Sequence, residues 1–231
     1  MDAEPANTFS RMHQPSLAER VTTDLREAIL GGRMRPGDKI SDARIAEAMG
    51  VSRAPVREAI RHLAAQGLVR EEPRRGAFVT SLSRTGVHDI YECRRALEVF
   101  AAQWLSVNAK REASRELNGI IRGMDQVASI GDREGLAQVD QRFHGHLIGL
   151  TGNVWLARLY SVISDQMLMI LSVNTAAHPL DDIHEMTAIH VPIVKAIAAG
   201  DPKRAATAVL NHLEIAERQF VAEAGHLFDE D

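Results

Sequence analysis

The chain has 231 residues, of which 45% are hydrophobic and 25% are charged. This composition is typical of globular proteins and excludes a disordered or collagen-like chain. The single cysteine excludes an intramolecular disulfide and a metal site built on paired cysteines. No uninterrupted apolar run approaches the ~20 residues needed to span a bilayer, and the first fifteen residues lack the apolar core of a secretory signal. We therefore expect a cytoplasmic protein without a membrane partner.

Charge and histidine content differ between the two parts of the chain. Residues 1–80 carry 13 Lys and Arg against 11 Asp and Glu, a net charge of +2, whereas residues 81–231 carry 14 against 20, a net charge of −6. Eight of the ten histidines lie beyond residue 80. Only 4% of the residues are aromatic, which disfavours a stacking platform for single-stranded nucleic acid. The length is sufficient for two domains with different chemistry.

The first part of the chain has the pattern of a winged helix-turn-helix. Residues 1–15 show no periodicity, so we expect a flexible N-terminal arm. Ser16 and Glu19 form a capping box, and Ser41 and Ser52 are candidate N-caps of two further helices. Two strand-like runs, 68–72 and 77–80, flank a basic turn. Three helices followed by a two-stranded wing predict a winged helix-turn-helix over residues 16–80, in which the third helix enters the major groove of DNA.

Basic residues mark the surface that we expect to face DNA. Arg53, Arg57 and Arg61 recur at intervals of four on the expected third helix, opposite its apolar face. Arginine suits bidentate contacts with guanine or phosphate. An isolated arginine stripe is more often a solvated charged face. The combination with capped helices and a basic wing turn favours DNA binding.

Specific motifs in this region resemble the GntR family of bacterial transcription regulators. They are the segment 50–59 (GVSRAPVREA), Gly67-Leu68-Val69, and the segment 75–79 (RGAFV). The resemblance covers about residues 17–80. The family usually has an arginine two residues after the serine at position 41, where this chain has Ala43, and the adjacent arginine is a candidate substitute. The resemblance implies that operator DNA contacts Ser52, Arg53 and Arg57, assisted by the wing residues Arg74, Arg75 and Gly76. Either Arg44 takes the place of the family's arginine or the operator preference differs.

The second part of the chain is predicted to be entirely helical. Apolar residues from Ser83 onward follow helical spacing in six segments, the fifth running from about Asp181 to Ala199. The breaks between the segments are short, so consecutive helices should pack as antiparallel neighbours. We therefore expect a mainly α fold, with the winged helix-turn-helix followed by an all-α six-helix bundle over residues 83–225.

Polar residues interrupt the apolar stripes of this bundle. Asp140 and His144 are four residues apart and therefore share one helix face, while His190 and His212 lie on the inward stripes of two later helices. A lone histidine on such a stripe is usually a hydrogen-bonded core residue. Buried polar groups need partners, and one divalent metal ion would satisfy all four side chains.

Residues 94–98 (RRALE), 140–144 (DQRFH) and the two later histidines resemble the FCD effector domain of FadR-type GntR regulators, over about residues 83–223. The six-helix count resembles the VanR-like subgroup. The resemblance implies that Asp140, His144, His190 and His212 bind one divalent metal ion. Three imidazoles and a carboxylate suit zinc, with nickel, manganese or iron as alternatives.

An ion with open coordination positions can also bind a small carboxylate. Arg94 is then the candidate for effector binding, because a guanidinium pairs with a carboxylate through two parallel hydrogen bonds. Arg95 is a weaker candidate. The alternative for both arginines is a surface ion pair with Glu98.

Together these features predict a homodimeric, DNA-binding transcription regulator, a repressor and not an enzyme, whose affinity for operator DNA is controlled by a small organic acid or sugar acid. One alternative is a regulator in which the metal ion is itself the signal. A metal-dependent enzyme is a second alternative, but the chain has no zincin motif, nucleophile elbow or phosphate loop. An acyl-CoA effector is disfavoured because the inward histidines would leave its cavity polar.

Overall fold

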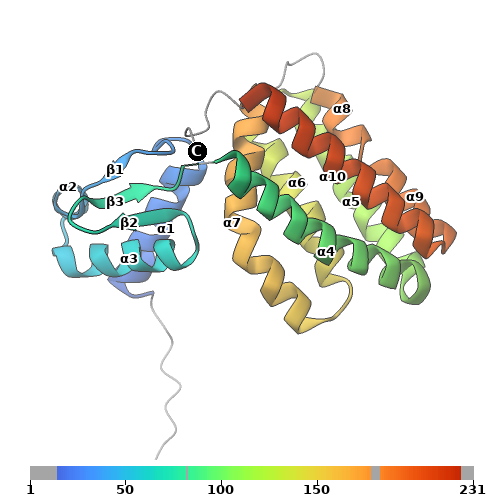
Figure 1. Ribbon diagram of the computed structural model, residues 1–231, viewed down its shortest axis with the longest axis horizontal. Helices are drawn as coiled ribbons and strands as arrows, with labels where there is room; N and C mark the ends of the chain where they lie inside the picture. Colours follow the sequence, from blue (N-terminus) through green and yellow to red (C-terminus); the bar gives the residue numbers. More distant parts are fainter. Residues whose placement is uncertain (1–14, 82, 178–182, 225–231) are drawn as a thin grey trace, which may run out of the picture.

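The computed structural model describes residues 15–81, 83–177 and 183–224. Figure 1 shows a small part of helices and strands beside a larger, all-helical part. The prediction of a mainly α fold, with an N-terminal winged helix-turn-helix and a C-terminal helical bundle, is confirmed. The arm expected over residues 1–15 lies, except for its last residue, outside the described residues, as does residue 225.

The small part contains three helices and a three-stranded sheet, and we call it the head. Its elements are α1 (Leu17–Leu30), β1 (Lys39–Ile40), α2 (Asp42–Met49), α3 (Arg53–Ala65), β2 (Val69–Glu72) and β3 (Gly76–Val79). The capping box of Ser16 and Glu19 begins α1, as expected, and the side chain of Ser41 caps α2. The apolar faces of α1 and α3 pack together, burying Val21, Leu25, Val56, Ile60 and Leu63.

The wing has one strand more than the sequence predicts. Strand β3 lies in the middle of the sheet, with β2 antiparallel on one side and β1 on the other. Only two residues of β1 pair with β3, Lys39 opposite Phe78 and Ile40 opposite Ala77. A two-residue strand has no periodicity, which explains why it was missed. The turn between β2 and β3 contains Arg74 with a φ of 66°, and Gly76, the first residue of β3, has a φ of 108°.

The larger part, which we call the bundle, contains helices α4 (Arg84–Asn108), α5 (Lys110–Ser129), α6 (Arg133–Gly149), α7 (Val154–Ala177), α8 (Ile183–Ala188), α9 (Val191–Ala199) and α10 (Pro202–Ala224). Helix α4 packs against α10 and α9, and α6 packs between α5 and α7 (Figure 1). The expected fifth helix is thus two helices. Pro192 explains the break before it, because proline lacks an amide donor and clashes with the carbonyl four residues earlier.

Helix α7 connects the bundle with the head. Asp165 of α7 is buried and forms an ion pair with Arg26 of α1. Among the described residues, one stretch, Val154–Ser172 of α7, is long and apolar enough to cross a membrane by length and composition alone. Two charged residues interrupt it, Arg158 and Asp165. Of this stretch, 39% is buried where α7 packs against its neighbours, mainly α6, and Trp155, Leu159 and Val162 are exposed.

Candidate metal centre and nucleic-acid interface

The four predicted metal ligands come together inside the bundle. Asp140 and His144 lie one turn apart on α6, His190 lies at the break before α9, and His212 lies on α10. All four are buried, with exposed fractions of 8%, 1%, 0% and 3%. Because residues at i and i+4 share a helix face, the first two point together toward the histidines of the later helices.

The ligand atoms converge on one point. Nε2 of His144 lies 3.4 Å from Nε2 of His190 and 3.2 Å from Nε2 of His212. The carboxylate of Asp140 lies 3.1 Å from Nε2 of His190 and 3.6 Å from Nε2 of His144. Two nitrogens bound to a tetrahedral zinc ion at 2.0–2.1 Å are about 3.3 Å apart. The spacing of the imidazoles therefore fits a single ion of this size.

The outer nitrogens of two imidazoles are held by hydrogen bonds. Nδ1 of His144 lies 2.7 Å from Oε2 of Glu98, and Nδ1 of His190 lies 3.1 Å from the carbonyl oxygen of Met186. When Nδ1–H donates to these oxygens, the lone pair of Nε2 points inward, where a metal ion can accept it. Glu98 was not predicted to belong to this site. Its spacing of four from Arg94 on the same helix face was the available signal.

The electrostatics of the cluster favour the protonation states that bind metals. Burial lowers the pKa of His144 and lowers that of His212 well below its usual value. Burial alone would raise the pKa of Asp140 and of Glu98. The neighbouring His190 outweighs the effect of burial on Asp140 and lowers its pKa to about 2. Arg94 does the same for Glu98, whose pKa is also lowered to about 2. The lowered pKa of His144 and His212 favours their neutral imidazoles, and that of Asp140 favours its charged carboxylate, the forms in which these groups bind a divalent cation.

Arg94 lies beside this cluster, in the interior of the bundle. Its Nε donates to Oε1 of Glu98 at 2.6 Å, and both side chains are buried. The surface ion pair considered as an alternative is therefore wrong, because this pair is internal. Nη2 of Arg94 is buried without a hydrogen-bond partner among the described residues. Arg95 is instead partly exposed and pairs with Glu92 and Glu217, away from the cluster.

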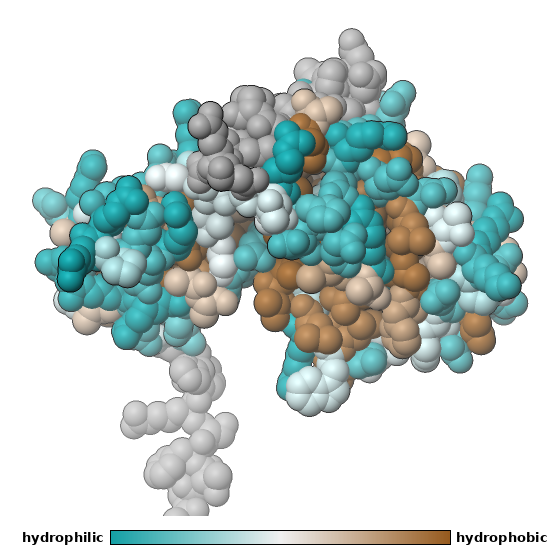
Figure 2. Space-filling model, in the orientation of Figure 1, coloured by the Kyte–Doolittle hydropathy of each residue, from teal (hydrophilic) through white to brown (hydrophobic). Residues whose placement is uncertain are grey.

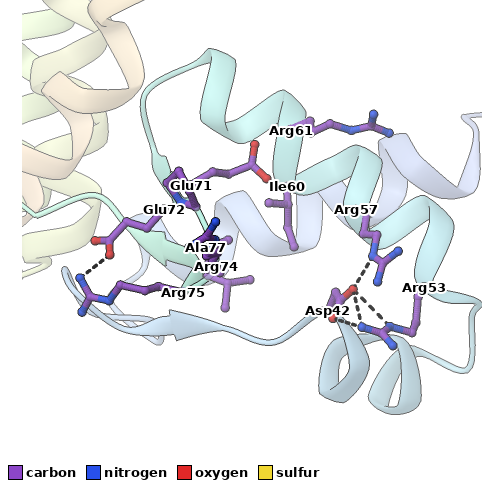
Figure 3. A pocket seen from close by; sticks show the side chains of 13 residues that line it. Asp42, Arg53, Arg57, Ile60, Arg61, Glu71, Glu72, Arg74, Arg75 and Ala77 are labelled. Atoms are coloured by element: carbon purple, nitrogen blue, oxygen red, sulfur yellow. Dashed lines mark hydrogen bonds and ion pairs between the residues drawn. The ribbon is translucent and has the colours of Figure 1, made fainter.

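In the head, the candidate DNA contacts lie on one surface, formed by α3, the start of α2 and the wing, which we call the recognition surface (Figure 3). The side chains of Arg53 and Arg57 are 55% and 60% exposed, and both bind the carboxylate of Asp42. Their hydrogen bonds lower the pKa of Asp42 to about 2. Ser52 occupies the N-cap position of α3, but its side chain makes no cap hydrogen bond.

The other candidate DNA contacts flank this surface. Arg74, Arg75 and Gly76 of the wing line the same groove as Arg53 and Arg57. Arg75 also forms an ion pair with Glu72 of β2. Arg44 is exposed on the first turn of α2, where its amide is bound by the Ser41 side chain. Asp42, which contacts both arginines of α3, was missed, since only the packing of α2 on α3 brings it there.

Comparison with protein families identifies this architecture. The model of the bacterial regulatory proteins, gntR family, matches residues 17–79, and the FCD domain model matches residues 89–215. The chain belongs to the GntR family. The first match includes every candidate DNA contact, and the second includes the four candidate metal ligands and Arg94.

Individual relatives of this GntR protein match nearly its whole length. A probable D-xylose utilization operon transcriptional repressor of Paenarthrobacter nicotinovorans is 32% identical over 206 residues, 89% of each chain. The gluconate operon transcriptional repressor of Bacillus licheniformis is 25% identical over 193 residues, 82% of this chain and 79% of the relative. The crystal structure of a GntR transcriptional regulator from Rhodococcus sp. RHA1 is 27% identical with a TM-score of 0.73, covering 89% and 97% of the two chains.

Proposed function

We propose that this GntR protein is a cytoplasmic transcriptional repressor that binds operator DNA as a homodimer and is controlled by a small carboxylate bound at a metal ion. The observation that carries the proposal is the presence, in one chain, of an arginine-bearing recognition surface and a buried cluster of three imidazoles and a carboxylate. The names of the two repressors above support the direction of regulation.

The proposed cofactor is one divalent metal ion per chain, bound by Asp140, His144, His190 and His212. The imidazole spacing and the donor set suit zinc, while nickel, manganese or iron remain chemically suitable alternatives. The ion would supply open coordination positions for an oxygen ligand. The chain itself orients two of the imidazoles, through Glu98 and the carbonyl of Met186.

The proposed effector is a small organic acid or sugar acid. Nη2 of Arg94 is a buried donor for which the described part of the chain offers no hydrogen-bond partner, and leaving such a donor unpaired is costly. An oxygen of a bound carboxylate would satisfy it. Because Arg94 and His144 share Glu98, the arginine is held next to the metal cluster. The relatives named for D-xylose and gluconate operons point to a ligand derived from a sugar.

A second copy of the chain is the proposed partner of an exposed apolar face. Helix α4 exposes Phe100, Trp104 and Val107, and α7 exposes Trp155, Leu159 and Val162, both sets at i, i+4 and i+7. Figure 2 shows apolar surface gathered on the bundle in the region of α4 and α7. Contiguous exposed apolar surface of this kind marks interaction sites. A two-fold dimer would present two recognition helices to a two-fold operator.

Contacts through α7 offer a route from the metal cluster to the head. Gln141 follows the proposed ligand Asp140 on α6. The side-chain amide Nε2 of Gln141 donates a hydrogen bond to the backbone carbonyl of Ser164 on α7. The next residue, Asp165, pairs with Arg26 of the head. If effector binding shifts α6 against α7, the head shifts with it. Such a switch requires different affinities of the effector for the two arrangements.

A thermal-shift screen of the purified protein against organic acids and sugar acids, with and without prior chelation, tests this proposal. An effector at ~100 times its Kd adds about 2.7 kcal/mol of stability. We expect one acid class to raise the Tm, an effect that chelation abolishes, and to weaken operator binding. If chelation lowers the Tm and no acid raises it, the metal ion is structural or is itself the signal. Turnover of a bound acid without DNA binding would favour an enzyme.

A further inference from the structure

Asp42 occupies a central position on the recognition surface. It is the first residue of α2, and its carboxylate accepts hydrogen bonds from two arginines of α3 (Figure 3). Arg53 donates from Nη2 to Oδ1 at 2.8 Å and from Nε to Oδ2 at 3.2 Å. Arg57 donates from Nε to Oδ2 at 2.6 Å. One carboxylate thus links the two arginines, one turn apart, that are proposed to contact DNA.

The two arginines are bound in different ways. Arg53 uses its Nε and Nη2 edge, so Nη1 is the terminal amino group left for another acceptor. Within the described ranges, Arg57 is bound to Asp42 through Nε alone, which leaves its two terminal amino groups available to another acceptor. Reading guanine requires two parallel donors aimed at O6 and N7. Arg57 retains such a pair, whereas Arg53 retains a geometry suited to a single phosphate oxygen.

We propose that Asp42 determines sequence specificity by orienting Arg57 to read a guanine and by restricting Arg53 to a phosphate contact. This inference rests on the proposed function, because it requires operator binding through α3. Arginine is a long and flexible side chain, and holding it in place before binding reduces the ordering that binding must impose. The side chain of Asp42 is only 21% exposed, while both arginines extend from it into solvent.

This role has a signature that a merely structural one lacks. A carboxylate next to DNA repels phosphates, so its removal strengthens binding that depends only on backbone charge. The same removal frees Arg57 to adopt other orientations, which weakens discrimination between bases. Specific and nonspecific affinity therefore change in opposite directions. If Asp42 only stabilised the start of α2 through the helix dipole, its loss would weaken both kinds of binding together.

The test uses the full-length protein and a library of randomised DNA duplexes. The wild type is expected to enrich a two-fold motif, and affinities for this duplex and a scrambled one are then measured by fluorescence anisotropy. Asp42→Asn is expected to lower the ratio of motif affinity to scrambled affinity about tenfold, within the range of one bidentate base contact. It is also expected to bind the scrambled duplex more tightly than the wild type does. Asp42→Glu, which keeps the charge, should give a ratio between those of the Asp42→Asn variant and the wild type.

Matched variants separate the outcomes. Glu47→Gln removes one exposed negative charge from the same helix and should strengthen binding to both duplexes without changing their ratio. Arg57→Ala should remove the preference for guanine at one motif position. Arg53→Ala should weaken binding to both duplexes by the same factor. If the ratio of the two affinities in the Asp42→Asn variant stays within twofold of the wild-type ratio, the inference is overturned while operator binding stands. If the wild type enriches no motif, the proposed function fails, and the inference with it.

Discussion

Glu98 and His144 form a buried contact of 2.7 Å between a carboxylate oxygen and an imidazole Nδ1. The other oxygen of Glu98 accepts a hydrogen bond from Arg94 at 2.6 Å. One carboxylate therefore orients a candidate metal ligand and the candidate effector arginine together. This coupling explains why the metal centre and the effector site are expected to respond to each other, and it makes the bundle testable residue by residue.

Replacement of His190 by alanine is expected to abolish stoichiometric metal retention. His190 is fully buried, and its Nε2 faces both Asp140 and His144. Metal content per chain, measured by mass spectrometry of the purified and dialysed protein, checks this. His146→Ala is the matched control, since His146 is partly exposed and binds Glu116 outside the cluster. Undiminished metal in the His190 variant would show that the ligand assignment is wrong.

Replacement of Arg94 by lysine is expected to preserve metal binding and to abolish the acid-induced rise in Tm. Lysine keeps a positive charge near Glu98 but lacks the planar fork of a guanidinium. Arg95→Lys serves as the control because Arg95 pairs with Glu92 and Glu217. The measurement is the thermal shift with the effector acid, made on protein of confirmed metal content. A full shift in the Arg94 variant would remove Arg94 from the effector site.

The metal-free protein is expected to lose stability as the pH falls below about 6.5, the ordinary histidine pKa. The folded chain lowers the pKa of His144 and His212, so over this range the unfolded chain binds more protons and acid favours unfolding. Asp140 and Glu98 have pKa values near 2 and add a further loss below about 4. Denaturant titration of chelated protein at several pH values checks the profile. Stability that is constant between pH 7 and 5 would contradict it.

Replacement of Leu159 by glutamate is expected to convert a dimer into a monomer. Leu159 is 59% exposed within the apolar face of α4 and α7, and a charge there would be buried in the proposed interface. Sedimentation velocity measures the change, with metal content as the check on folding. Leu17→Glu is the control, because Leu17 is comparably exposed, at 54%, on α1 of the head. Dimeric Leu159→Glu protein would place the interface elsewhere.

Replacement of Asp165 by asparagine is expected to weaken communication between effector and DNA. The change removes the ion pair with Arg26 that joins α7 to α1. Effector and operator should each still bind, while the effector-induced change in operator affinity, typically 5–150-fold, becomes smaller. Operator titrations with and without saturating effector measure this. Arg26→Gln should give the same result from the other side of the pair, and unchanged coupling in both variants would exclude this contact.

The order and type of most elements were predictable because their signals are local. Serine caps, glycine and proline breaks and helical spacing lie within a few residues of the structure that they specify, so α1 to α7 and α10 follow from the sequence. The break at His190 was also encoded locally, by Pro192, but the apolar spacing across it concealed two helices. The two-residue strand β1 has no pattern of its own and exists only because it pairs with β3.

Local spacing was sufficient to indicate the residue types at both candidate sites, because Asp140 and His144 share one face of α6 and the arginines share one face of α3. Which charged groups these side chains contact depends on how the helices pack. Glu98 lies 46 residues from His144, and Asp42 lies 11 and 15 residues from Arg53 and Arg57. Contacts at such separations depend on how helices pack, through the combined burial of many side chains, and no local pattern records that.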